Sequence, residues 1–194
     1  MRGQFASTWT KRDVWRLAGV LMAWSIVVAP VVEAARAQSG MARPMASPGA
    51  APALDDARLD TLEAVAVAHI NAERASAGVD PLVVSPELSR IARAYCRDMA
   101  ERQFFAHLDP DGKMVYDRAA RGGVSDWTNI AENIARNRGF DDPAAVAVRE
   151  WMKSEGHRDN ILDARFIETG LGAWVGADRT VYFAEIFIRR AKRR

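Results

Sequence analysis

Apolar side chains recur every three or four residues in three stretches of the chain, which predicts three amphipathic helices. The first covers residues 56–77 and ends at Gly78. The second and third begin at the capping residues Ser85 and Asp142, each followed by a proline at the first helical position. Gly156 is the predicted end of the third helix. The apolar face of the second helix consists of Leu88, Ile91, Ala92, Tyr95, Cys96 and Met99.

On either side of the third predicted helix, the pattern indicates strands. Residues 170–175 and 180–188 are mostly apolar, β-branched or aromatic, and the turn Gly176–Arg179 between them completes a predicted β-hairpin. Residues 129–135 are a predicted third strand. Helices at the start and in the middle, with strands in the middle and at the end, predict an α+β fold. In such a fold, helices pack on a small, mostly antiparallel sheet.

The first 37 residues have the composition of a secretory signal peptide. A basic segment precedes an uncharged apolar stretch over residues 17–32, and Ala35 and Ala37 are the small residues of a cleavage site. An apolar stretch of this length is shorter than the roughly 20 residues that span a bilayer. We therefore expect cleavage after Ala37 and a secreted or periplasmic protein, with an uncleaved membrane anchor as the alternative.

Composition changes the picture mainly through charge. Residues 38–57 are a predicted linker rich in Ala, Pro, Gly and Ser, followed by one domain over 58–190 and a basic tail over 191–194. The whole chain has a net charge of +2, but residues 1–37 hold five of its basic and only two of its acidic side chains. The remainder carries a slight acidic excess, so we expect no nucleic-acid partner, and no transmembrane segment once the signal is removed.

Three polar side chains are candidates for chemistry. His107 lies where a helix gives way to the turn 109–112, His157 directly follows Gly156, and Glu132 interrupts an apolar strand. Two histidines and a carboxylate could hold a divalent metal such as Zn²⁺ with an open position. They could equally form a His–Glu pair in which one imidazole is a general base. Spacing does not decide between these, and a structural role for each histidine is the third interpretation.

Other reactive residues point less clearly to a site. His69 lies on the first helix without a neighbouring turn, and we assign it no site role. Cys96 is the one cysteine, which excludes an intramolecular disulfide and a cysteine-based zinc finger; its place on an apolar face predicts a buried free thiol. Ser154 precedes His157 by three residues, but no G-x-S-x-G motif surrounds it.

Taken in order, six groups of short motifs resemble those of the CAP superfamily of cysteine-rich secretory, antigen 5 and pathogenesis-related proteins. The resemblance is to the bacterial SCP-like extracellular branch and covers about residues 58–188. The motifs are NAER at 71–74 with 78–82; the helix over 88–99; FFAH at 104–107 with 109–112 and 117–118; AENIA at 131–135; WMKS at 151–154 with 156–158 and 160–162; and GLG at 170–172.

This resemblance implies a three-layer α-β-α sandwich with a central cleft that carries two histidines and two glutamates. By motif, the cleft residues are His107, Glu132 and His157, with Zn²⁺ as a possible ligand of the histidine pair. The second glutamate belongs at the position of Ser154, with Glu155 one residue later, so this sequence departs from the family pattern at the fourth member of the site. The cysteines of eukaryotic members are also missing.

Three classes of function remain open. The first is a secreted or envelope-associated binding module whose His/Glu cleft takes a lipid-like or cell-surface ligand, with or without a divalent metal. The second is a zinc-dependent hydrolase of extracytoplasmic peptide or cell-wall material, with Glu132 as proton acceptor. The third is a structural envelope component. We favour the binding module because the second carboxylate is displaced and no independent nucleophile motif is present.

Overall fold

The computed structural model describes residues 7–10 and 56–191. Most of the predicted signal peptide, the predicted linker up to residue 55, and residues 192–194 of the predicted tail lie outside this range. The helices are α2 (Asp56–Ser76), α3 (Pro86–Glu101), α4 (Val115–Arg121), α5 (Pro143–Lys153) and α6 (Glu155–Leu162). The strands are β1 (Ser7–Thr10), β2 (Val83–Val84), β3 (Trp127–Asn137), β4 (Glu168–Val175) and β5 (Val181–Arg190).

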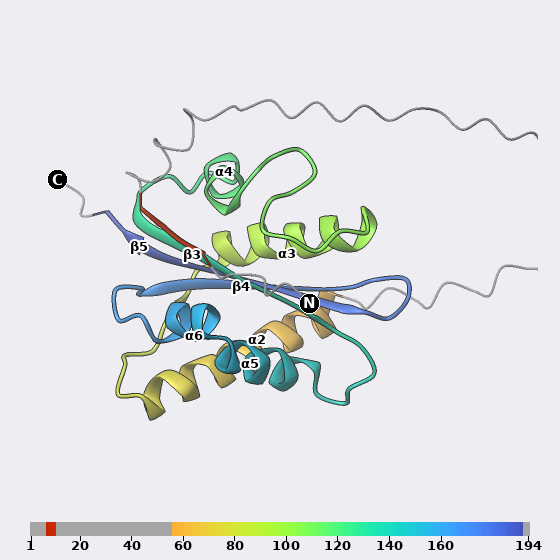
Figure 1. Cartoon of the computed structure of the whole chain (residues 1–194), viewed down its shortest axis with the longest axis horizontal. Coiled ribbons are helices and arrows are strands. Elements are labelled where there is room, and N and C mark those ends of the chain that lie inside the picture. The colour runs from red at the N-terminus through yellow and green to blue at the C-terminus, as the bar shows by residue number, and fades with distance from the viewer. Residues whose placement is uncertain (1–6, 11–55, 192–194) are drawn as a thin grey trace, which may run out of the picture.

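One sheet with the strand order β1-β3-β5-β4-β2 forms the middle layer. Neighbouring strands are antiparallel except β2 and β4, which are parallel. Figure 1 shows α3 and α4 on one face of the sheet and α2, α5 and α6 on the other. The predicted α+β fold, a three-layer sandwich around a mostly antiparallel sheet, is confirmed.

Each face of the sheet has its own apolar core. Even-numbered residues of β3 and β5, such as Ile130, Ile134 and Ile186, pack against the apolar face of α3, all six predicted members of which are buried. Odd-numbered residues such as Ala131 and Phe183 pack against α2, α5 and α6. This alternation follows from the two-residue period of a strand and leaves both faces of the sheet covered.

The approach of α3 to β4 is unusually close, because glycines face the helix there. A Cβ atom on Gly170 would lie 2.2 Å from the backbone of Leu88, and one on Gly172 would lie 2.0 Å from the backbone nitrogen of Arg93. The GLG motif at 170–172 therefore lets the helix backbone rest directly on the strand.

Most predicted element boundaries are confirmed. Ser85 accepts a hydrogen bond from the amide of Leu88, and Asp142 accepts one from the amide of Ala145, so both capping residues act as expected. The prediction for Gly156 is wrong: α5 already ends at Lys153, and Gly156 lies inside the separate helix α6. A short break at Ser154, with extended backbone, separates these two helices.

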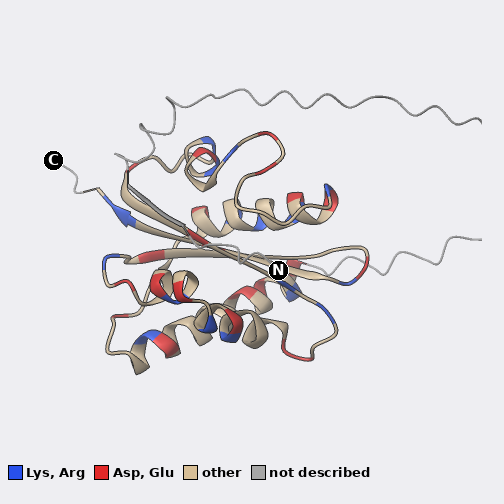
Figure 2. Cartoon of the chain, in the orientation of Figure 1, with Lys and Arg blue, Asp and Glu red and all other residues tan. Residues whose placement is uncertain are grey.

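Charged residues of both signs are interspersed along the helices on both faces of the sheet (Figure 2). Within the described residues, no helix is both long enough and apolar enough to cross a membrane.

Candidate functional site

The predicted site residues come from three different layers of the fold. His107 lies in the loop between α3 and α4, Glu132 in the middle of β3, and His157 in the first turn of α6. Nδ1 of His107 lies 2.9 Å from Oε1 of Glu132. The imidazole rings of the two histidines are 6.5 Å apart between centroids. The structure therefore brings together three side chains that are up to 50 positions apart in the sequence; we call His107, Glu132 and His157 the polar cluster.

Glu132 is fully buried, and both of its carboxylate oxygens have partners. Oε1 faces His107, while Oε2 accepts a hydrogen bond of 2.6 Å from a terminal nitrogen of Arg118. A buried carboxylate without a partner would be costly, and a charge-assisted bond to a guanidinium offsets that cost. Arg118 thus provides the positive charge that keeps Glu132 in place beneath His107.

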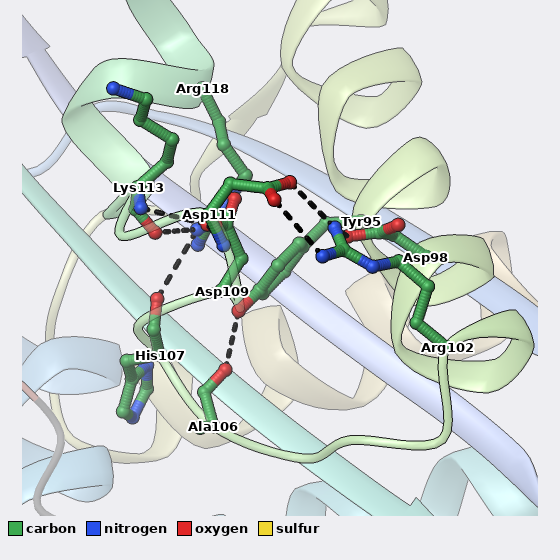
Figure 3. A network of polar contacts seen from close by, with 9 residues as sticks. All are labelled: Tyr95, Asp98, Arg102, Ala106, His107, Asp109, Asp111, Lys113 and Arg118. Atoms are coloured by element: carbon green, nitrogen blue, oxygen red, sulfur yellow. Dashed lines mark hydrogen bonds and ion pairs between the residues drawn. The ribbon is translucent and has the colours of Figure 1, made fainter.

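Arg118 also fixes the loop that carries His107. Its other terminal nitrogen donates to the backbone oxygens of His107, at 3.2 Å, and Lys113, at 2.9 Å. Its guanidinium lies 3.4 Å from the centre of the Tyr95 ring, and the hydroxyl of Tyr95 donates to the backbone oxygen of Ala106 (Figure 3). The chain on both sides of the His107 Cα is therefore held by α3 and α4.

The remainder of this loop is held by its own acidic residues. Oδ1 of Asp109 accepts from the amides of Asp111, at 2.9 Å, and Lys113, at 2.7 Å. Asp111 in turn forms a bidentate ion pair with Arg102 at the end of α3, which Figure 3 shows at the outer side of the network. His107 is therefore mounted on a loop with defined geometry.

His157 is positioned independently on the other face of the sheet. Its Nδ1 lies 2.9 Å from Oγ of Ser154, and its backbone oxygen accepts a hydrogen bond of 3.1 Å from the side chain of Asn133. Asn160 donates to the same Asn133 side chain. Burial, and next the nearby His107, lower the pKa of His157 to about 4, so this imidazole is neutral at physiological pH.

In both histidines one ring nitrogen is engaged and the other is not. Nδ1 faces Glu132 in His107 and Ser154 in His157. Nε2 of each is buried and has no hydrogen-bond partner in the described part of the chain. A buried imidazole nitrogen without a partner is uncommon and is consistent with a site for a ligand or cation. Within the described residues, however, no group of three or more potential ligands is arranged to hold a metal ion.

The remaining candidates have other environments. Ser154, at the position of the second family glutamate, contacts His157 through its hydroxyl, whereas Glu155 is exposed at the start of α6. His69 is 42% exposed and lies 3.7 Å from Asp142. Cys96 is a buried free thiol, as predicted.

A cavity of about 370 Å³ lies beside the polar cluster, between α3 and α4. Tyr95 and Arg118 line it together with Asp109, Asp111 and Arg102, whereas His107 and His157 do not. Arg118, which binds Glu132, and Tyr95, which stacks on Arg118, therefore connect the cavity to the polar cluster. Neither Tyr95 nor Arg118 stands out in the sequence as a site residue. Tyr95 belongs to a predicted apolar helix face, and Arg118 belongs to one of the family motifs.

Residues 67–187 match the family model described as CAP, the cysteine-rich secretory protein family. Two Bacillus subtilis proteins are similar in sequence. YkwD is 40% identical over 102 residues, which are 53% of this chain and 38% of that protein. YlbC, named as a membrane protein, is 34% identical over 120 residues, 62% of this chain and 32% of that protein. The matched region thus spans less than two fifths of the length of each of these relatives.

Solved structures of bacterial proteins share the fold. An extracellular SCP-domain protein from Bacillus anthracis is 26% identical, with a TM-score of 0.58 over 71% of this chain and 44% of that chain. An outer surface protein from Borrelia burgdorferi has a TM-score of 0.63 at 16% identity, over 71% of this chain and 97% of that chain. The family match includes all three residues of the polar cluster, and the chain belongs to the CAP, or cysteine-rich secretory protein, family.

Proposed function

We propose that this CAP-domain protein acts outside the cytoplasm as a binding module, and that the polar cluster is where its ligand binds. The observation that carries the proposal is the pair of buried, unpartnered Nε2 atoms of His107 and His157. Each histidine is anchored through Nδ1, so that Nε2 is the free nitrogen of the ring. Such preorganisation favours recognition because little side-chain freedom is lost on binding.

The proposed location rests on two observations. Residues 1–37 have the composition of a signal peptide. A structural relative at 26% identity is described as an extracellular protein. The ligand in this proposal is a lipid-like molecule or a component of the cell envelope.

Zn²⁺ fits the polar cluster in part. If Nδ1–H of each ring donates to its Glu132 or Ser154 partner, each Nε2 has a lone pair available for a metal, and the carboxylate partner of His107 is typical around zinc ligands. Glu132 itself is a poor third ligand, since both its oxygens already accept hydrogen bonds. The protein would therefore contribute two ligands.

The ring separation sets a geometric requirement. With roughly 2.1 Å between zinc and nitrogen and about 1.1 Å from nitrogen to ring centre, tetrahedral zinc needs centroids about 5.3 Å apart. The observed 6.5 Å suits only a nearly linear arrangement. Zinc binding would thus require the two rings to approach by about 1 Å.

These unpaired nitrogens also favour the second candidate, a zinc-dependent hydrolase of extracytoplasmic peptide or cell-wall material. Bound zinc would supply Lewis-acid polarisation of a substrate carbonyl. Glu132 would accept a proton, at the expense of its bond to His107 or Arg118.

Calorimetric titration with zinc tests the metal component. We expect wild type to bind one ion, His107→Ala and His157→Ala to lose most of the affinity, and Glu132→Gln to lose about 10–100-fold as the partner of a ligand. The matched control is His69→Ala, which removes a histidine outside the cluster and leaves binding unchanged. Absence of zinc binding by wild type would refute both the metal site and the hydrolase.

Extraction and mass spectrometry of lipid bound to the purified protein tests the binding module itself. We expect lipid to be recovered from wild type and depleted in the double variant His107→Ala/His157→Ala. Equal recovery from both proteins would show that the polar cluster is not the binding site.

A further inference from the structure

The two long edges of β3 have different partners. β5 pairs with β3 from Trp127 to Asn137. On the opposite edge, which we call the outer edge, β1 pairs only with residues 129–132. Ser7 lies opposite Glu132, and Thr10 opposite Asn129, in antiparallel register. A short segment from the far N-terminus of the chain thus completes the sheet beside the polar cluster (Figure 1).

The outer edge of β3 also runs past both histidines. His107 approaches Glu132 from the α3 and α4 layer, whereas His157 belongs to the opposite layer, where its backbone oxygen binds Asn133. A continuous sheet separates these layers, so rings 6.5 Å apart must meet around an edge of β3. Because β5 covers one edge along the whole strand and β1 covers the other only as far as Glu132, they meet at the outer edge beyond Glu132. Any strand in the register of β1 therefore points its N-terminal end toward the histidine pair.

The helices on both faces of the sheet lie outside the segment that carries β1. Among the residues whose side chains the structure describes, both apolar clusters are built from positions between 62 and 188. β3 is the described element with which β1 makes its main contacts. β1 also lies within the segment predicted to be removed on export. Loss of residues 1–37 would leave unpaired the backbone donors and acceptors that point to the outer edge, which belong to alternate residues of 129–132.

We propose that the outer edge of β3 at residues 129–132 is a strand-addition site for an extended polypeptide, and that residues 7–10 of the precursor fill it before cleavage. The site binds by adding an antiparallel strand to the sheet, as β1 does. The inference goes beyond the proposed function by adding a second site, for a polypeptide, and it rests on that function only for the role of the nearby histidines.

Such an edge recognises the extended conformation of a polypeptide more than its sequence. Affinity comes from main-chain hydrogen bonds, so any segment that is readily extended can compete. The observed occupant, STWT, consists of a serine and of β-branched and aromatic residues, which favour strands. A bound polypeptide that continues beyond the position of Ser7 would pass Asn133 and come alongside His107 and His157.

Hydrogen exchange read by mass spectrometry tests the proposal on the full chain and on a form that begins at Gln38. The probe is a synthetic peptide of residues 4–13, and its matched control carries N-methyl groups on Thr8 and Trp9, which keep the side chains but block pairing. We expect the amides that point to β1, which belong to alternate residues of 129–132, to exchange about tenfold or more faster in the shorter form, whereas the amides between them stay bonded to β5. The probe should restore protection and the control should not.

If these amides exchange at the same rate in the two forms, residues 7–10 do not occupy the edge. If a saturating concentration of the probe does not protect the shorter form, the edge does not accept an added strand. Equal protection of β5 amides in both forms verifies folding. If the shorter form does not fold, the full-length double variant Thr8→Pro/Trp9→Pro replaces it. Repeating the hydrogen-exchange measurement with the probe on the double variant His107→Ala/His157→Ala separates strand addition from the proposed function. Strand addition should persist in this variant, whereas zinc or lipid binding should be lost.

Discussion

Glu185 of β5 should make the stability of this protein fall as the pH rises above neutrality. The side chain is fully buried, and burial raises its pKa to about 8. The hydroxyl of Thr169 is a donor to both Oε1 of Glu185, at 3.0 Å, and the backbone oxygen of Ile186, at 3.1 Å, while Oε2 of Glu185 has no partner among the described residues. One shared hydrogen compensates only part of the cost of burying a charged carboxylate, so burial outweighs this bond and the charge of Arg74, both of which lower the pKa.

Two buried groups determine the size of the effect. The unfolded chain loses the Glu185 proton near pH 4.5 and the folded chain near pH 8, so between these values stability falls by about 1.4 kcal/mol per pH unit. His157 acts in the opposite direction: the unfolded chain gains its proton near pH 6.5 and the folded chain near pH 4, so stability rises with pH in that window. The two slopes offset each other from about pH 4.5 to 6.5. A net loss of about 2 kcal/mol remains between pH 6.5 and 8.

Urea denaturation at a series of pH values from 6.5 to 8.5 measures this loss. Glu185→Gln keeps the shape and can donate to Thr169, but it does not titrate in this range. We expect the free energy of unfolding of wild type to drop by about 2 kcal/mol relative to the variant as the pH rises through the window. Parallel curves for the two proteins would show that Glu185 does not hold a proton in the folded state.

Three further predictions concern buried residues. Gly172→Ala should cost roughly 1–3 kcal/mol or more in denaturant titrations, because its Cβ would lie 2.0 Å from the backbone nitrogen of Arg93; a neutral result would disprove the close packing of α3 on β4. Cys96 should react with thiol reagents slowly in native protein and rapidly in denaturant, since it is buried and burial raises the thiol pKa; fast native labelling would contradict this. In a Glu185→Gln background, acidification from pH 6.5 to 4 should lower the melting temperature, and adding His157→Gln should remove most of that shift.

Sequence patterns predicted the fold where a single local signal was strong. The capping residues Ser85 and Asp142 located two helix starts, and the six-residue apolar face of α3 was fully correct. Gly156 misled because the chain is already broken two residues earlier, at Ser154, so that this glycine falls in the first turn of the next helix. The seven-residue helix α4 was missed because it is too short to show a repeating apolar face.

The polar cluster could be predicted as a set of residues but not as a network. His107, Glu132 and His157 stand out because each is polar in a turn-rich or apolar context. Arg118 does not, since arginine is usually exposed, and its burial here depends on partners that only the folded chain brings together. The strand order of the sheet, and with it the pairing of β1 beside Glu132, also has no local signal in the sequence.

The opposite edge of the sheet limits how these molecules can associate. Along β4, the amide of Ala173 donates to the carboxylate of Glu63, which Arg93 also binds, and the outermost strand β2 is only two residues long. This edge therefore offers few free backbone groups to another strand, and a molecule that lost β1 would expose the opposite edge alone. Substituting Glu63 would leave the amide of Ala173 without its carboxylate partner and weaken the protection of the β4 edge.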